Sequence, residues 1–192
     1  VGGLAYNSAL NIGQQGGGVV TGTNLTSGSL KIAIGSNAAI SVGASANGNA
    51  TGQVAGSAYA KAAAINSAGI PNLTATADTT VQAAWTDITA AGYSLSLNGA
   101  TIFSGYDGSV TALTGDAVAS AINANTGASG VTAVYDSTTG LVTMNASDGR
   151  NIAVSQTLGG AETANDGLHG TGGGTNNTVN AALVFDTAQG AT

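Results

Sequence analysis

The chain of 192 residues contains no cysteine. It therefore forms no disulfide and offers no thiolate to a metal, and its stability must come from packing and from sheet hydrogen bonds. With a single histidine in the chain, a zinc site would have to be built largely from carboxylates. Cysteine usage leaves the cellular compartment open.

Charge is also scarce, since only 6% of the residues are charged. The cations are Lys31, Lys61 and Arg150, against nine acidic residues, for a formal net charge of −6. Nucleic acid is excluded as a partner because neutralising phosphates requires clustered Lys and Arg. Anionic membrane surfaces are disfavoured for the same reason.

Aromatic residues make up 4% of the chain, and no apolar run approaches the roughly 20 residues of a membrane helix. What the chain does contain is glycine, at 31 positions, with much Ala, Ser, Thr and Asn. Its 43% apolar content indicates a folded core rather than a disordered segment. A core of such small side chains is predicted to be β-rich.

The residues that catalysis needs are dispersed. The one histidine, His169, lies in a Gly-rich stretch that we expect to be an irregular, solvated loop, a poor place to orient a base. Asp166 lies three residues before it, but no nucleophile-elbow or HExxH motif accompanies the pair. The acids occur singly, and Asp107, Asp136 and Asp148 stand at turn positions. We therefore predict no enzymatic activity, no catalytic residue, no metal site and no cofactor.

Residues 114–127 are predicted to form a helix. Thr114 and Asp116 offer N-cap oxygens, and Gly127 can close the C-terminus. Val118 and Ile122 lie four residues apart, on one helical face. Three short strands are predicted to follow, over residues 131–135, over residues 141–146 and around Ile152 and Val154.

A similar helix is predicted earlier, from the N-cap Ser57 to Gly69, followed by a strand over residues 73–78. The two helices share the sequence AIN, at Ala64-Ile65-Asn66 and Ala121-Ile122-Asn123, and the following strands share TA. The offset between the two copies is 57 to 58 residues, so residues 57–78 and 114–136 are predicted to be equivalent helix-strand units.

Between these units, Asn98-Gly99 predicts a hairpin of residues 93–97 and 100–103. One face of that hairpin is expected to be buried, and Trp85 before it is interpreted as a core anchor. A first strand over residues 30–34 is predicted to pair with residues 39–42. A last strand, residues 181–185, is predicted to return beside the first.

Together these elements predict an α+β, β-rich fold. It has small antiparallel sheets and two short helices in two helix-strand units, in an elongated two-subdomain architecture. Residues 1–56 with residues 156–192 would form one β-rich subdomain. Residues 57–155 would form the helix-strand repeat subdomain.

Three short sequence segments resemble the repeat motif in the central region of bacterial flagellins. In chain order they are AIN, GVTA and DGRNI. The resemblance covers residues 57–155, about half of the chain, and DGRNI at residues 148–152 is its most specific part. It implies the surface-exposed part of a structural subunit of the flagellar filament, extracellular and antigenic, that serves motility. Its partners would be other flagellin subunits, with O-glycans on Ser or Thr as a further possibility.

The helical ends that build the filament core in that family are absent from this sequence. The isolated chain is therefore expected to be a monomer. Its two ends, near Val1 and near Thr192, are expected to emerge on the same side.

Two other interpretations stay open. A hook-associated or filament-cap protein carries a related motif. A carbohydrate-binding surface adhesin would require an exposed platform of four aromatic rings, Trp85, Tyr93, Tyr106 and Tyr135.

Overall fold

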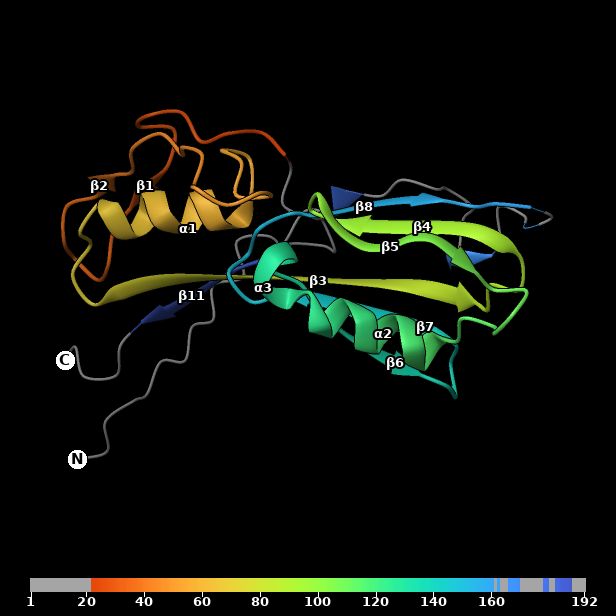
Figure 1. The fold of residues 1–192 in the computed structure, drawn as a ribbon. Helices are drawn as coiled ribbons and strands as arrows, with labels where there is room; N and C mark the ends of the chain where they lie inside the picture. Colours follow the sequence, from red (N-terminus) through yellow and green to blue (C-terminus); the bar gives the residue numbers. More distant parts are fainter. Residues whose placement is uncertain (1–21, 161, 163–165, 170–177, 180–181, 188–192) are drawn as a thin grey trace. The chain divides into compact units, whose positions relative to one another are not determined.

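The computed structural model describes residues 22–160, 162, 166–169, 178–179 and 182–187 (Figure 1). The fold is α+β and β-rich, with small antiparallel sheets and three short helices, as the sequence predicts apart from the third helix. The expectation that the two ends emerge together concerns residues that lie outside the described part of the chain.

The chain divides into two compact units. Unit 1 contains residues Val1–Thr79, Ser147–Asn151 and Asn180–Thr192, and unit 2 contains Thr80–Ala146 and Ile152–Val179. Residues 57–155, expected to form one subdomain, are thus divided between the two units. The reason is that strand β3 (Leu73–Thr86) runs from one unit into the other, and that a five-residue segment after β7 returns to unit 1.

Unit 1 is built around helix α1 (Ala58–Ser67), whose N-cap Ser57 accepts a hydrogen bond from the N–H of Ala60 at 3.2 Å. The helix stops where Gly69 adopts a positive φ of 63°, followed by Pro71. The strands β1 (Lys31–Ile32) and β2 (Ile40–Ser41) pair antiparallel as predicted. The core of this unit combines four alanines with three branched aliphatic side chains: Val42, Ala58, Ala62, Ala64, Ile65, Ile70 and Ala75.

The last strand, β11 (Ala182–Thr187), pairs antiparallel with the first half of β3. The prediction that it lies beside the first strand was therefore wrong. Strand β3 is also longer than the predicted 73–78, because its second half finds partners of its own in unit 2. Such partners are distant in sequence, and no local pattern indicates them.

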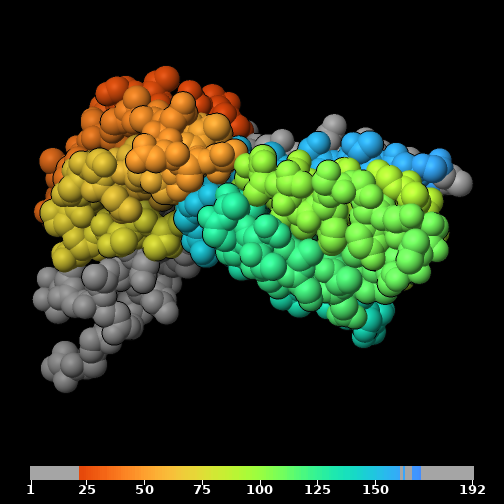
Figure 2. Space-filling view, in the orientation of Figure 1, coloured from red at the N-terminus to blue at the C-terminus, as the bar shows by residue number. Residues whose placement is uncertain are grey.

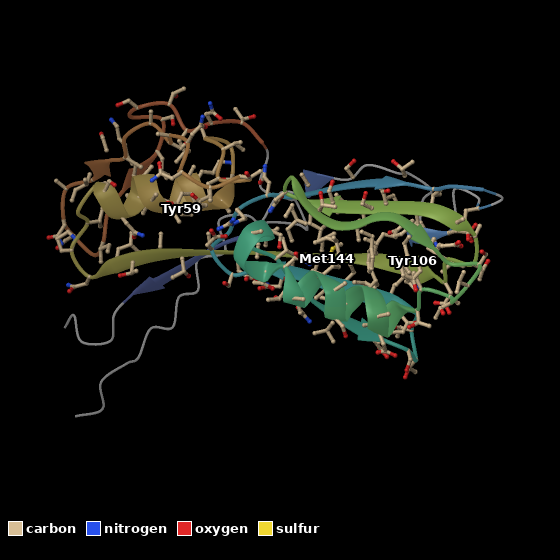
Figure 3. All side chains as sticks on the ribbon, viewed as in Figure 1. Tyr59, Tyr106 and Met144 are labelled. Atoms are coloured by element: carbon tan, nitrogen blue, oxygen red, sulfur yellow. The ribbon has the colours of Figure 1, made fainter. Side chains whose placement is uncertain are left out.

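Unit 2 encloses one core between two groups of strands and a helix (Figure 1). One sheet has the order β10 (Thr178–Val179), β8 (Ile152–Thr157), β4 (Ala91–Leu97) and β5 (Ala100–Asp107). Opposite it, the second half of β3 pairs with β7 (Leu141–Ala146), which pairs with β6 (Thr132–Asp136). Met144 of β7 is 1% exposed and lies in this core (Figure 3).

The β4–β5 hairpin forms as the sequence predicts. Asn98 and Gly99 both have positive φ, 50° and 81°, as the tightest hairpin turns require. Tyr93, Leu95 and Leu97 alternate along one face and are at most 1% exposed. The hairpin and helix α2 (Gly115–Ala124) both reach the surface of unit 2 in the view of Figure 2.

Helix α2 begins at the predicted N-cap, where Thr114 accepts a hydrogen bond from Ala117 N–H at 3.4 Å. Val118 and Ile122 are fully buried, as their spacing predicts. The prediction that Gly127 closes the helix was wrong. Asn125 ends α2, and Gly127 lies in a further short helix, α3 (Thr126–Ser129), which Gly130 closes at a φ of 71°.

Candidate functional site

The segment 148–152, the most specific part of the flagellin-like sequence, is held chiefly by unit 1. Asp148 accepts a hydrogen bond from Nε2 of Gln53 at 2.8 Å, and Arg150 places its Nη2 at 2.8 Å from Oδ2 of Asp148. Nε of Arg150 contacts both oxygens of that carboxylate at 3.0 Å. The acid and the base of the motif therefore neutralise each other.

The backbone of this segment is fixed by three further hydrogen bonds. The Thr79 hydroxyl donates to the Arg150 carbonyl at 2.6 Å. The Tyr59 N–H donates to the Gly149 carbonyl at 3.0 Å, and the Asn151 N–H donates to the Gly52 carbonyl at 2.9 Å. The segment 148–151 is thus anchored from three separate parts of unit 1.

Gly149 is required at its position for two reasons. Its φ is +75°, which residues with a Cβ rarely adopt, and a Cβ built there would collide with the methyl group of Ala77. The sequence signal DGR therefore has a packing explanation: the acid, the base and the glycine between them each have a partner inside the unit.

Burial alone would raise the pKa of Asp148, but the hydrogen bonds from Arg150 and Gln53 together outweigh it and hold that pKa below its ordinary value. Asp148 remains charged near neutral pH, and the side chain of Arg150 is 16% exposed. The side chain of Asp148 is 31% exposed, and its hydrogen bonds from Gln53 and Arg150 join parts of the fold that are distant in sequence.

A second arrangement of hydrogen bonds, made by an asparagine side chain, occurs in both predicted repeats. In unit 1 the carboxamide of Asn66 donates to the Ala75 carbonyl at 2.9 Å and accepts from the Ala75 N–H at 2.8 Å. In unit 2 the carboxamide of Asn123 does the same with Ala133, at 2.8 and 2.7 Å. We call this arrangement the Asn clamp.

Each Asn clamp joins the last turn of a helix to the strand that follows it. The preceding isoleucines, Ile65 and Ile122, are 1% and 0% exposed. Both predicted units therefore consist of a capped ten-residue helix, a buried Ile, a clamping Asn and a strand. The sequence repeat AIN corresponds to one structural role in both copies.

Gln156 holds a strand in a similar way. Its Nε2 donates to the Leu168 carbonyl at 2.7 Å and its Oε1 accepts from the Leu168 N–H at 3.1 Å. In a chain with few charged residues, neutral carboxamides thus supply side-chain hydrogen bonds to strand backbones.

His169, expected in an irregular loop, belongs to strand β9 (Gly167–His169), which pairs with β3. That expectation was wrong because Leu168 is buried and draws the Gly-rich stretch into the core of unit 2. The Nδ1 of His169 lies 3.2 Å from the Gly167 carbonyl. In the part of the chain that the structure describes, no three His, Asp or Glu side chains are grouped as metal ligands would be.

Two of the four aromatic residues considered for a ligand platform are buried. Trp85 and Tyr93 are 6% and 0% exposed and meet edge to face, with ring centroids 6.1 Å apart. Burial raises the pKa of the Tyr93 phenol, whose hydroxyl donates to Gln156 at 3.2 Å. Tyr106, labelled in Figure 3, and Tyr135 are partly buried against the same core. Trp85 is thus the core anchor that the sequence predicts.

Unit 1 contains an open groove of about 410 Å³ between α1 and the loop that follows β2. Its lining includes Tyr59 (Figure 3) with Ala60 and Ala63 of α1, and Ala44, Asn47 and Gly48 of the loop. None of the lining residues is charged. No sequence pattern indicates this groove, because its lining comes from two separate segments of the chain, within residues 41–48 and 59–68.

No helix within the described residues is long and apolar enough to cross a membrane. A scan of protein-family models and a search of curated proteins gave no match. The flagellin-like character of residues 57–155 therefore stays a prediction from the sequence.

Proposed function

We propose that this chain is the outer, solvent-projecting part of a bacterial flagellin, a structural subunit of the flagellar filament that serves motility outside the cell. The observation that carries the proposal is the repeated AIN, whose Ile and Asn have the same roles in both helix-strand units. A motif that recurs with its hydrogen bonds marks a repeated building block.

The arrangement of the flagellin-like segment 148–152 supports a structural role. The charges of Asp148 and Arg150 bind each other, and the backbone of the segment is fixed within unit 1. Both charged side chains of the segment are thus engaged with each other. Stability obtained from packing and neutral hydrogen bonds, without disulfides, suits a part that is exported as a chain and folds outside the cell.

The adhesin alternative finds less support than the filament proposal. It requires Trp85, Tyr93, Tyr106 and Tyr135 to be available to a sugar together, whereas the first two lie in the core of unit 2. A hook-associated or filament-cap protein remains the second candidate, because the related motif would have the same internal roles there.

Immunogold electron microscopy tests the proposal and separates these candidates. Antibodies raised against the purified chain are applied to cells that express its gene, and a strain lacking the gene serves as the control. We expect gold particles along the whole length of the filaments. Label confined to the filament tip or to the hook junction would favour the second candidate. Label over the cell body would favour an adhesin and refute the proposal.

A further inference from the structure

Two Asn-Gly dipeptides occur in the sequence, Asn47-Gly48 and Asn98-Gly99, and the fold places them in opposite environments. Asn47 is exposed in the loop of unit 1, whereas Asn98 is 3% exposed in unit 2. We propose that Asn47-Gly48 is a site of spontaneous deamidation in the native protein and that the fold holds Asn98-Gly99 unreactive. This inference is independent of the proposed function.

The chemistry needs only the chain and water. The backbone nitrogen of the glycine attacks Cγ of the asparagine, a C–N bond forms, and the side-chain nitrogen leaves as ammonia. Water then opens the resulting succinimide at either carbonyl and gives aspartate or isoaspartate. Glycine allows this ring closure most readily because it has no Cβ to obstruct the attack and tolerates the required backbone rotation.

At Asn98 both ends of the carboxamide are engaged. Its Nδ2 donates to the Ser129 carbonyl at 2.9 Å, and its Oδ1 accepts from the Ala153 N–H at 2.8 Å. Its backbone N–H also donates to the Ala153 carbonyl at 2.9 Å. Turning Cγ toward the nitrogen of Gly99 would break both carboxamide bonds and leave the carbonyl of the buried Ser129 without this donor, so the reactive conformation costs free energy.

At Asn47 the carboxamide has one partner among the described residues. The Ala55 N–H donates to its Oδ1 at 2.7 Å. Only this one bond of the carboxamide has to be released for the attack, against two at Asn98. The leaving Nδ2 belongs to an exposed side chain, so water can reach it.

One backbone hydrogen bond opposes the reaction at Asn47. The Gly48 N–H donates to the Gln53 carbonyl at 2.6 Å and must be released before its nitrogen can attack. This bond closes a short loop in which Gly48 is half-buried and Gln53 is buried, whereas Asn47, Asn49 and Thr51 are exposed. Opening such a partly exposed loop costs less than opening the hairpin end at Asn98, which is 3% exposed. Deamidation would add a negative charge at the rim of an otherwise uncharged groove, because Asn47 and Gly48 both line it.

Hydroxylamine provides the test, because it cleaves the chain at a succinimide. The folded protein and the protein in urea are treated in the same buffer. The cleavage sites are then identified by mass spectrometry, and the unmodified Asn98 peptide is quantified after peptic digestion. In the folded protein we expect cleavage at residue 47 and a rate at residue 98 that is roughly ten- to hundredfold lower. In urea the two rates should converge.

The variant Asn47→Gln is the matched control, since glutamine would have to close a larger ring and loses the fast route. It should abolish cleavage at residue 47 and leave the rates of cleavage at residue 98, in the folded protein and in urea, unchanged. Equal rates at the two sites in the folded protein would overturn the proposal. So would a folded protein in which neither site reacts while both react in urea.

Discussion

The Asn clamp in unit 2 offers the sharpest test of how this fold is held together. Replacing Asn123 by alanine removes two hydrogen bonds to Ala133, which is 3% exposed and pairs with Met144 on its other side. A hydrogen bond contributes about 1 kcal/mol net, so the pair is worth about 2 kcal/mol. Alanine recovers about 0.5 kcal/mol because it is the better helix former. We expect Asn123→Ala to lower the free energy of unfolding by about 1.5 kcal/mol.

Urea denaturation followed by fluorescence measures this loss directly. Trp85 is the only tryptophan of the chain and lies in the core of unit 2, so its emission reports on that unit. The control is Ser120→Ala, at an exposed position of the same helix. This control should change stability by no more than about 0.5 kcal/mol, in the favourable direction, from helix propensity alone.

The isosteric variant Asn123→Asp refines the test. A carboxylate can accept from the Ala133 N–H, but its second oxygen would face the Ala133 carbonyl and repel it. We expect a loss at least as large as that of alanine near neutral pH, and a smaller loss in acid, where the protonated group can donate. If Asn123→Ala and Ser120→Ala have the same stability within error, the clamp is incidental and the reasoning is refuted.

Three further predictions concern other features of the chain. Asp148→Asn should destabilise unit 1 by about 1 kcal/mol at neutral pH, since the carboxylate is partly exposed and its ion pair is therefore screened. Because the fold lowers the pKa of Asp148, its contribution should be fully present above the unfolded pKa of about 3.9 and be lost as the pH falls through the folded value. Hydrogen exchange of unit 1 peptides in the wild type and the variant should therefore converge in acid, and a difference that persists there would contradict the role of the ion pair. Gly149→Ala should lower the free energy of unfolding by about 1–3 kcal/mol more than Gly28→Ala does. Both glycines have similar positive φ, but only a Cβ at residue 149 collides with a neighbour, Ala77. Equal losses of stability in thermal unfolding would show that φ alone matters. Sedimentation of the isolated chain at high concentration should give a single species near 18.1 kDa, and a discrete oligomer or fibres would place assembly surfaces within it.

The elements that the sequence predicts well are those specified by near neighbours. The hairpin follows from Asn98-Gly99, which can adopt two successive positive φ values, and the helices follow from the caps Ser57 and Thr114. These signals need no knowledge of the rest of the fold. The failure at Gly127 has a local cause as well, because Asn125 ended the helix two residues earlier.

The sequence did not predict which strands and side chains pair when they lie far apart along the chain. Strand β11 pairs with β3 across more than a hundred residues, and β9 is stabilised by Leu168 entering a core formed elsewhere. Gln53 binds Asp148 across 95 positions, so the motif DGR was visible but its partner was not. The AIN repeat marked Asn66 and Asn123 as equivalent, but their hydrogen bonds appear only once helix and strand are placed together.

The filament proposal is tested most directly by the protein composition of purified filaments. Filaments sheared from cells that express this gene, and purified away from the cell bodies, are dissociated and digested, and the peptides are quantified by mass spectrometry. We predict that peptides from residues 57–155 are among the most abundant in the filament fraction, in proportion to a repeating subunit. Their presence only in the cell-envelope fraction, or at the trace level of a cap or junction protein, would contradict the proposal.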